Sequence, residues 1–302
     1  MRKPRRSYTK VKILFWILVL LGGAWIAFIP PSSPPPPVGI TIPVKVPEEP
    51  PVPPTPSSHT EQPPTASSPE THPSVPPPHP AAPRLALVID DVGVDLKDSE
   101  RAIRLPAPIT LSFLPYGGRL REQTKEARAH GHELLLHMPM EPLGHEDPGP
   151  GALLVDLPMH DLQQRFETAL ASFTGFDGVN NHMGSKFTQF PEGMEMVVTE
   201  LQARHLFFLD SRTSAQSIGL KIAAEKGLPS AGRDVFLDDD INADSITAQL
   251  HAAERVARHK GFAIAIGHPH PATLEVLERW IPDAEKQGFE FVPVHMLVKQ
   301  SP

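Results

Sequence analysis

Apolar and polar residues between Leu85 and Val294 alternate in blocks that predict repeated strand and helix units. Short apolar runs are separated by amphipathic segments of about ten to sixteen residues, a spacing typical of βα repeats around a parallel sheet. Several runs are almost entirely apolar, as expected of strands that are buried on both faces. The predicted strands span 85–89, 109–114, 133–136, 178–181, 206–209, 234–237, 262–266 and 289–294.

Amphipathic helices are predicted in the intervening segments. In the last of them Leu274, Leu277 and Ile281 fall on one face, and Gly288 follows as a stop signal. The predicted helices span 97–104, 120–130, 161–173, 193–204, 217–226, 244–260 and 272–287. Seven or eight βα units favour an α/β fold of the closed or nearly closed barrel type, with an open doubly wound sheet as the alternative.

One apolar segment near the amino terminus stands apart from this pattern. Residues 11–29 are apolar except for Lys12, and about 17 to 25 such residues cross a membrane as a helix. A cleaved signal peptide is the alternative, but the run is long for one, and Pro30 and Pro31 follow without a small-x-small cleavage site. Basic residues precede the run, so the amino terminus is expected in the cytoplasm and the rest of the chain across the membrane. These basic residues are Arg2, Lys3, Arg5, Arg6 and Lys10.

Proline is concentrated in the segment that follows. Of the 38 prolines in the chain, 22 lie between Pro30 and Pro83, so this segment lacks the apolar area to offset its ordering entropy and is predicted to be disordered. A polyproline rise of about 3.1 Å per residue gives it a reach of roughly 150 Å, which suits a fixed polymer or a protein partner. We therefore divide the chain into a basic flank and anchor (1–30), a linker (31–83) and a folded domain (84–302).

Charge and cysteine content narrow the chemistry. The formal net charge of -7 and the mixture of both signs in the folded part argue against a nucleic-acid partner. Because the chain has no cysteine, it has no disulfide, thiolate metal site or cysteine nucleophile. Any metal site must therefore use His, Asp or Glu.

Titratable residues follow the predicted strands at the points where the strands end. The carboxyl ends of parallel barrel strands lie on one rim, which is where active sites of this architecture are found. We therefore expect these side chains to converge on a single site. They are Asp90, Asp91, His137, His182, Asp210, Asp238 and His268, with Ser211 beside Asp210.

These strand ends fall within five sequence motifs. The motifs are LVIDDVG at 87–93, GHELLLHMPME at 131–141, NNHMGS at 180–185, FFLDSRT at 207–213 and IGHPHP at 266–271. In this joint order they resemble the divergent polysaccharide deacetylases, which are distant relatives of the NodB-type carbohydrate esterases. The resemblance covers 84–299 and implies a NodB-like (β/α) barrel and a metal-dependent hydrolase that acts on carbohydrate amides or esters.

The resemblance implies different roles for the two aspartates that end the first strand. Asp90 is implied to be the general base and Asp91 a metal ligand, although the sequence leaves the assignment between them open. His137 matches the first metal histidine of the second motif, while Glu141 stands at the position of the second. Glu141 remains a candidate ligand, and His182 is a candidate for the missing imidazole. The implied cofactor is a divalent metal ion, with zinc expected.

The last motif supplies the candidate acid. His268 matches the histidine that protonates the leaving group in NodB-type enzymes, and Asp210 is expected to orient His268 or Arg212. His270 is expected to support His268 or to join the metal. The acidic run at 238–240 is interpreted as the start of a helix. The candidate substrate-binding residues are Asn181, Ser185, Arg212 and His270.

Together these features predict a deacetylase of bacterial envelope polysaccharide. The enzyme is expected to be anchored in the inner membrane by residues 11–29, with its catalytic domain in the periplasm and a cell-envelope glycan as substrate; metal-activated water would attack the acetyl carbonyl. The alternative is a catalytically inactive glycan- or protein-binding module or an envelope scaffold. Glu141, and the lack of an evident arginine-containing third motif, favour that alternative.

Overall fold

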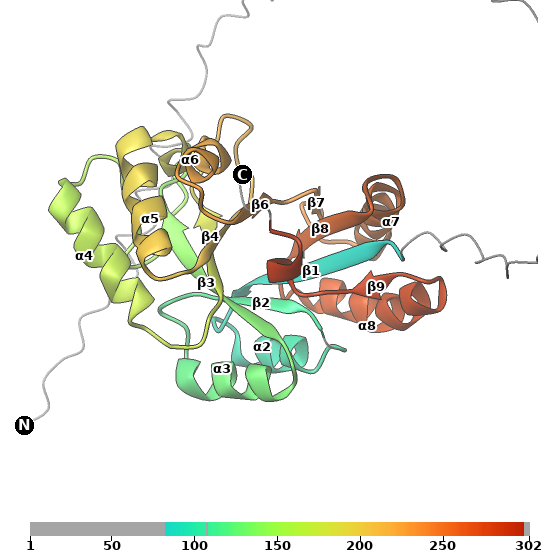
Figure 1. Ribbon diagram of the computed structural model, residues 1–302. Coiled ribbons are helices and arrows are strands. Elements are labelled where there is room, and N and C mark those ends of the chain that lie inside the picture. Colours follow the sequence, from blue (N-terminus) through green and yellow to red (C-terminus); the bar gives the residue numbers. More distant parts are fainter. Residues whose placement is uncertain (1–81, 107, 299–302) are drawn as a thin grey trace, which may run out of the picture. The chain divides into compact units, whose positions relative to one another are not determined.

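The computed structural model describes residues 82–106 and 108–298 (Figure 1). The predicted anchor at 11–29 and nearly all of the predicted linker at 31–83 lie outside these residues, so both stay predictions. Among the helices of the described residues, none has the length and apolar character needed to span a membrane.

The described residues form an α/β domain whose elements follow the predicted order. The strands are β1 (Arg84–Val92), β2 (Thr110–Phe113), β3 (Glu133–Met140), β4 (Gly178–Met183), β5 (Phe207–Asp210), β6 (Ser230–Gly232), β7 (Val235–Phe236), β8 (Phe262–Gly267) and β9 (Glu290–Phe291). The helices are α2 (Leu96–Ile103), α3 (Leu120–Ala129), α4 (Met159–Leu170), α5 (Pro191–Ala203), α6 (Gly219–Glu225), α7 (Ala243–Lys260) and α8 (Pro271–Lys286), with short 3-10 helices at η1 (Phe187–Gln189) and η2 (Val294–Met296).

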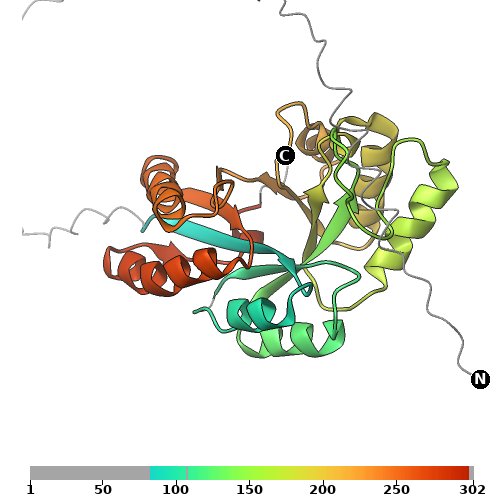
Figure 2. The same cartoon turned by 180° about the vertical axis from the view of Figure 1, so that it is seen from behind.

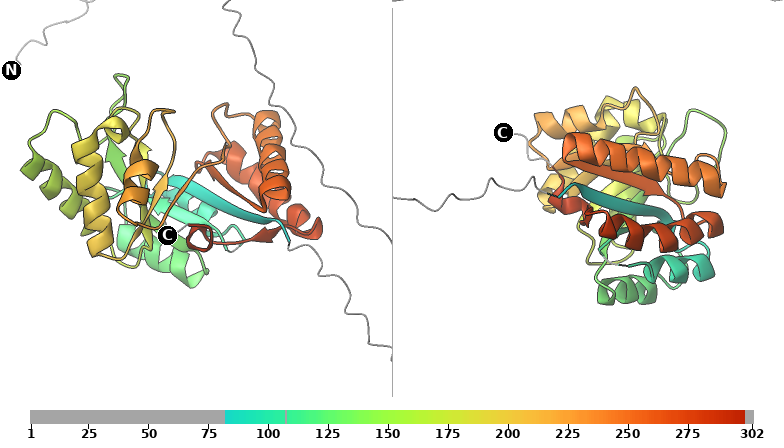
Figure 3. Two further views of the ribbon diagram at one scale, coloured as in Figure 1. Left: turned by 45° about the horizontal axis from the view of Figure 1, so that its top comes forward. Right: turned by 90° about the vertical axis from the view of Figure 1, so that its right-hand side faces the viewer.

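The strands form one parallel sheet in the order β6-β5-β4-β3-β2-β1-β8-β7, with β9 beside β1. From β1 to β6 each strand lies next to its predecessor, so the right-handed crossovers all place their helices on the same face. Figures 1 and 2 show these helices outside the curled sheet, and the right-hand view of Figure 3 shows α7, α8, α2 and α3 succeeding one another around one side of it. The doubly wound alternative, which needs helices on both faces, is therefore wrong.

The sheet curls as a closed or nearly closed barrel would, but its described strands form only a half-barrel. In the described sheet β6 and β7 stand at opposite ends of the strand order and do not pair with each other. The chain between them steps from one end to the other: Arg233 N donates to Asp210 O (3.0 Å), and Asp234 N donates to Ile264 O (2.9 Å). The result is a curled half-barrel with a seam at residues 233–234.

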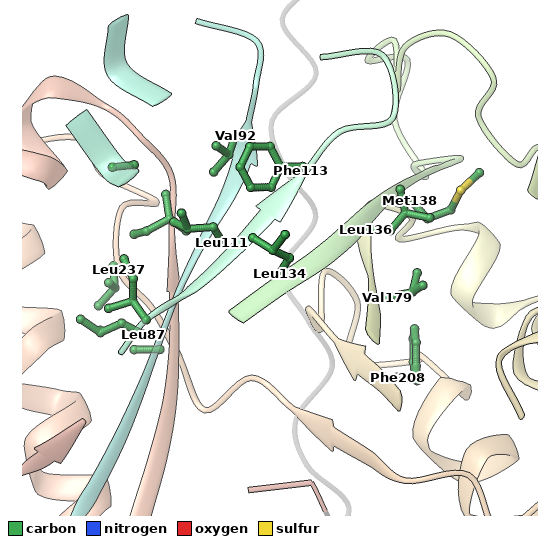
Figure 4. Close-up of a cluster of buried hydrophobic side chains, with 14 of the residues drawn as sticks. Leu87, Val92, Leu111, Phe113, Leu134, Leu136, Met138, Val179, Phe208 and Leu237 are labelled. Carbon is green, nitrogen blue, oxygen red and sulfur yellow. The ribbon is translucent and has the colours of Figure 1, made fainter. Parts of the chain in front are cut away.

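Two separate cores lie on the two faces of the sheet. In β1 the inward residues Ala86 and Val88 belong to a small core inside the curl, whereas Leu85, Leu87 and Ile89 belong to the larger core beneath the helices. Figure 4 shows part of the larger core, in which side chains from β1 to β5 meet the helix layer. Because both faces are buried, the strands carry few polar residues between their two ends.

The carboxyl-terminal segment covers the amino end of the half-barrel. Glu133, at the start of β3, is buried, and its carboxylate accepts hydrogen bonds from Thr110 Oγ1 (2.7 Å), Val294 N (2.7 Å) and His295 N (3.1 Å). A fourth bond joins the carboxylate to His295 Nδ1 (2.8 Å). Glu133 therefore fixes η2 to the first strands of the sheet at the end opposite the polar rim.

Strand β6 is not predicted by the sequence. Its three residues, Ser230, Ala231 and Gly232, lack the β-branched and aromatic side chains that mark a strand, and β6 is formed by its pairing with β5.

Candidate active site

The inward-facing positions of the strands change from apolar to polar near the carboxyl ends. In β1 the inner face reads Ala86, Val88 and then Asp90, and in β3 the inward Leu135 is followed by His137. The apolar part fills the curl, and the polar part forms the floor of a site at the rim. Three more buried polar residues lie at this level: Ser112, Asn180 and Ser211.

A bulge at the end of β1 brings both aspartates to this floor. Consecutive residues of a regular strand point to opposite faces, so only one of Asp90 and Asp91 should face inward. The pairing of β1 with β2 changes register between Ile89 and Val92, and Asp91 adopts a positive φ of 56°. As a result, both carboxyl groups reach the rim: the side chain of Asp90 is 3% exposed and that of Asp91 is 30% exposed.

Three of the predicted metal ligands converge on one point. Asp91 Oδ1 lies 2.8 Å from His182 Nδ1 and 3.3 Å from His137 Nε2, and the two ring nitrogens are 3.3 Å apart. Asp91 Oδ1 is buried, yet among the described residues none gives it a well-directed hydrogen bond. Three ligand atoms lie within 4.8 Å of one another, which suits a small divalent cation. We call Asp91, His137 and His182 the ligand cluster.

Asn180 orients the floor of this site. Its Nδ2 donates to Asp90 Oδ1 (2.8 Å) and to Ser211 Oγ (3.1 Å), and because a carboxylate only accepts, this fixes which way the amide points. Asn180 Oδ1 then accepts from Ser112 Oγ and from His137 Nδ1 (2.8 Å). His137 therefore carries a proton on Nδ1 and presents Nε2 to the ligand cluster, as metal-binding histidines commonly do.

The two neighbouring carboxyls have opposite pKa shifts. Burial raises the pKa of Asp90, and the nearby imidazoles of His137 and His268 offset only part of this effect. Burial also acts to raise the pKa of Asp91, but the imidazoles of His137 and His182, whose ring nitrogens lie 3.3 and 2.8 Å from Asp91 Oδ1, outweigh it and hold the pKa of this carboxyl far below its usual range. The surroundings thus favour the anionic form of Asp91, as a metal ligand requires, and the protonated form of Asp90, as expected of a base.

His268 lies beyond the end of β8 and is held by Asp238. Asp238 Oδ1 lies 3.0 Å from His268 Nδ1, and Asp238 Oδ2 accepts from His268 N (2.7 Å) and Thr273 Oγ1 (2.8 Å). Burial alone would lower the pKa of His268, but the bond to Asp238 and the charges of Asp90, Asp238 and Asp91 raise it to about 9. His268 is therefore protonated at neutral pH.

Glu141 does not join the ligand cluster. Its Oε1 forms an ion pair with Lys186 Nζ (2.6 Å), and its Oε2 accepts from Val155 N (2.6 Å). Glu141 follows the last residue of β3, where the chain turns away from the sheet, so the predicted role as ligand is not supported by its position.

Of the two predicted partners of Asp210, His268 and Arg212, the structure brings only Arg212 to it, through the backbone. Asp210 faces the other side of β5, where Oδ1 accepts from Arg212 N (2.8 Å) and Oδ2 accepts from Ser217 Oγ (2.7 Å). The carboxylate that holds His268 is Asp238, which lies on the rim as expected; its acidic run does not start a helix, because α7 begins at Ala243 after the N-cap Asn242. Asp210 instead fixes the turn after β5.

The four predicted substrate-binding residues lie around the rim in different settings. Asn181 is buried, donates to Met183 O (2.7 Å) and accepts from Ser211 N (2.9 Å), so it braces the chain rather than facing substrate. Ser185 Oγ accepts from Leu143 N (2.8 Å). Arg212 is exposed.

His270 is the predicted residue that stays close to the acid. Its ring centroid lies 5.8 Å from that of His268, and its ligand atom lies within 4.8 Å of those of Asp238 and His268. Asp238 already accepts three hydrogen bonds, from His268 N, His268 Nδ1 and Thr273 Oγ1. Its carboxylate is therefore less available to a cation than that of Asp91, whose Oδ1 has no directed hydrogen bond from the described residues.

Two residues of the site were missed or misread in the sequence, and a third supports the rim. Asn180, next to the predicted Asn181, is absent from the predicted site, and Asp238 is predicted on the rim but not as the partner of His268. Arg233, at the seam, donates through Nε to Ser211 O (2.6 Å) and through Nη2 to Arg212 O (2.8 Å), and burial lowers its pKa although the charge of Asp90 opposes this shift.

Comparisons with known proteins agree with this architecture. The profile of the divergent polysaccharide deacetylase family matches residues 87–298. An uncharacterised protein of Haemophilus influenzae is 40% identical over 198 residues, which cover 66% of this chain and 71% of that protein. The crystal structure of an uncharacterised protein from Agrobacterium tumefaciens aligns with a TM-score of 0.71 and 34% identity, over 72% of this chain and 90% of that one.

A more distant alignment is found with the catalytic domain of a peptidoglycan N-acetylglucosamine deacetylase from Eubacterium rectale. It has a TM-score of 0.47 and 13% identity, and it covers 74% of this chain and 93% of that chain.

Proposed function

The chain belongs to the divergent polysaccharide deacetylase family, and we propose that it is a metal-dependent deacetylase of envelope glycans. The observation that carries this proposal is the convergence of the ligand cluster beside Asp90, on the same rim as the His268–Asp238 pair. A Lewis-acid site, a base and an acid are the three parts that hydrolysis of an acetamide requires.

The residues present fit a divalent cation. Asp91, His137 and His182 would hold it through one carboxylate oxygen and two ring nitrogens, a donor set that suits zinc. When bound, the cation supplies Lewis acidity toward the acetyl carbonyl and toward water. The buried Asp91 Oδ1 without a directed hydrogen bond supports this assignment, because an anionic oxygen in that state is stabilised by a cation.

Asp90 is the proposed base. Its raised pKa favours uptake of a proton, and Asn180 holds one carboxylate oxygen in place. The other oxygen, Oδ2, lies 3.6 Å from His137 Nε2 and therefore next to the ligand cluster. In the reaction, Asp90 accepts a proton from the attacking water while the water oxygen adds to the carbonyl carbon.

His268 is the proposed acid. With a pKa of about 9 it carries a proton at neutral pH, and Asp238 occupies Nδ1, which leaves Nε2 to donate. Donation to the leaving nitrogen accompanies cleavage of the C–N bond, and the products are acetate and a free amine. Asp238 acts as a positioning residue through the imidazole.

The proposed location is the periplasm of a bacterium, with residues 11–29 as an anchor in the inner membrane. The apolar run and the basic flank before it support this location. The proline-rich segment at 31–83 would then give the domain the reach to act on a fixed envelope polymer.

The test measures metal binding and acetate release together on the full chain in detergent. Zinc is removed by a chelator and restored, and the substrate is the hexamer of N-acetylglucosamine. Wild type is expected to bind about one zinc per chain and to release acetate only with zinc. Asp91→Ala should lose both, whereas Asp90→Asn should keep zinc and lose at least about 100-fold in rate.

Glu141→Gln serves as the matched control, because Glu141 was a predicted ligand that lies outside the cluster. It should keep zinc and activity. Zinc and glycan binding by a folded wild type without acetate release would instead favour the catalytically inactive binding module, and an absence of zinc binding would refute the metal-dependent mechanism.

A further inference from the structure

Two grooves of opposite charge flank α4 on the outer face of the half-barrel. Because β2, β3, β4 and β5 are neighbours in the sheet and their helices lie on one face, α4 lies between α3 and α5 (Figure 1). One groove, of about 440 Å³, runs between α4 and α5. The other, of about 470 Å³, lies between α3 and the residues that follow α4. No residue of the candidate active site lines either groove.

The groove between α4 and α5 is acidic, and we call it the acidic groove. Among the described residues four glutamates line it, and no Lys or Arg does. Three of these glutamates are exposed and form no ion pair with a described residue, whereas the fourth is paired with the residue that caps α5. The thioether side chains of two methionines supply adaptable apolar surface beside the carboxylates. The residues used below are Glu167, Glu192, Glu195, Met159 and Met196.

Glu167 stands where its charge is unfavourable within one chain. It lies in the last turn of α4, at the negative end of the helix dipole, and α4 has no basic residue in that turn. A cation from outside the chain would offset this charge. The position of Glu167 therefore indicates that the acidic groove receives a basic surface.

The groove on the other side of α4 has the opposite charge, and we call it the basic groove. Arg121, Lys125 and Arg128 line it, and among the described residues no Asp or Glu does. Residues four and three positions apart on a helix share a face, so these three form one basic stripe along α3. Arg128 is paired with Asp177, whereas Arg121 and Lys125 form no ion pair with a described residue.

The two grooves complement each other, so a second copy of the chain supplies the charge that each of them lacks. A foreign basic partner would account for the acidic groove alone. In an isologous dimer, a two-fold axis that runs along α4 places the acidic groove of each copy against the basic groove of the other. Gln163, Gln164 and Thr168, which are exposed on α4, are uncharged, so two α4 helices can meet without repulsion between like charges.

We propose that the acidic and basic grooves form a self-complementary interface, through which two copies of this chain associate with α4 along the two-fold axis. The proposal is independent of the metal and of deacetylation, because neither groove contains a residue of the candidate active site. Exposed ion pairs are individually weak and are screened by salt, so the association is reversible and weakens as the salt concentration rises.

The test is cross-linking of the full chain in detergent with a short bismaleimide. The chain has no cysteine, so only introduced thiols react. Thr168→Cys places a thiol on the exposed surface of α4, and the control His259→Cys places one on the exposed surface of α7, outside both grooves. Thr168→Cys should give at least about 10-fold more covalent dimer than His259→Cys, and raising NaCl from about 0.05 M to about 0.5 M should remove most of this gain.

Charge reversal, with the cross-linking cysteine on α4 in place, tests the complementarity. Glu167→Lys, Glu192→Lys and Glu195→Lys together make both grooves of a copy basic, and Arg121→Glu with Lys125→Glu makes both acidic. Each reversed chain alone should lose at least about 10-fold in dimer, because like charges then face each other. An equal mixture of the two should recover the wild-type yield, because every contact again joins opposite charges.

Zinc binding and acetate release per chain should stay at the wild-type level in both reversed chains, so this test is separate from that of the proposed function. Thermal unfolding checks that the reversed chains fold. If one does not, Glu195→Gln, which only removes a charge, should still lower the yield of dimer.

Three results would overturn the interface. Equal cross-linking at positions 168 and 259 would show that contacts outside the grooves bring the copies together. A yield that charge reversal leaves unchanged, or that the mixture does not recover, would show that the grooves do not face each other. Chains that stay apart while the acidic groove binds a synthetic lysine-rich helical peptide would assign that groove to a basic partner protein instead of a second copy.

Discussion

Replacing Asn180 by Ala should separate the two roles of the buried floor, metal binding and stability. Asn180 is fully buried, and its amide is bonded to Asp90, His137, Ser112 and Ser211. Each buried polar group left without a partner costs about 1–3 kcal/mol, so the substitution should lower the free energy of unfolding by about 2–5 kcal/mol. Loss of the partner of His137 Nδ1 should also weaken zinc binding by about 10–100-fold.

Asn181→Ala is the matched comparison for this variant. Asn181 is also buried in β4, but its bonds go to Met183 O and Ser211 N rather than to a metal ligand or Asp90. It should lose stability by a similar amount while its zinc affinity stays within about 3-fold of wild type.

The assays are urea denaturation without metal and competition for zinc against a chromogenic chelator. Wild-type zinc affinity in Asn180→Ala would refute the reasoning, because His137 would then keep its geometry without the amide. An equal loss of zinc affinity in both variants would also refute it, since a general loosening of β4 would explain the result.

Two further substitutions test other parts of the domain. Asp238→Asn should lower the pKa of His268 from about 9 toward its ordinary value near 6.5, as measured by NMR titration of the imidazole. Because the pKa of His268 is raised in the folded state, the stability that the pair contributes is present below pH 6.5 and is lost as the pH rises through about 9. A wild-type titration of His268 in the variant would contradict this prediction. Glu133→Ala removes four hydrogen bonds at the amino end of the sheet. It should lower the free energy of unfolding, measured by urea denaturation, by about 2–4 kcal/mol while the zinc content stays unchanged. Loss of zinc in a folded variant would contradict this, because it would show that the two ends of the half-barrel are coupled.

The order and type of most elements could be predicted because short apolar runs alternate regularly with longer amphipathic segments. The apolar pattern could not predict which residue of each strand faces the site. With both faces of the sheet buried, the usual alternation of apolar and polar positions disappears, so Asn180 and Asn181 look alike in the sequence.

The same loss of alternation explains the error at β5. Asp210 and Ser211 follow one another, and only the register with β4 and β6 shows that Ser211 faces the site and Asp210 the helices. Glu141 was misread for a different reason: its partner Lys186 lies 45 residues further along, and such an ion pair leaves no local trace in the sequence.

The position of β1 has a consequence for how the domain is made on the ribosome. This first strand lies in the interior of the sheet, and it pairs along Arg84–Ile89 with β8, while its start also pairs with β9. Val294 and His295, which close the base over Glu133, lie 161 and 162 residues beyond it in the chain. The nascent chain must therefore keep one edge of β1 unpaired until β8 has been synthesised, which leaves this strand open to wrong pairing during that interval.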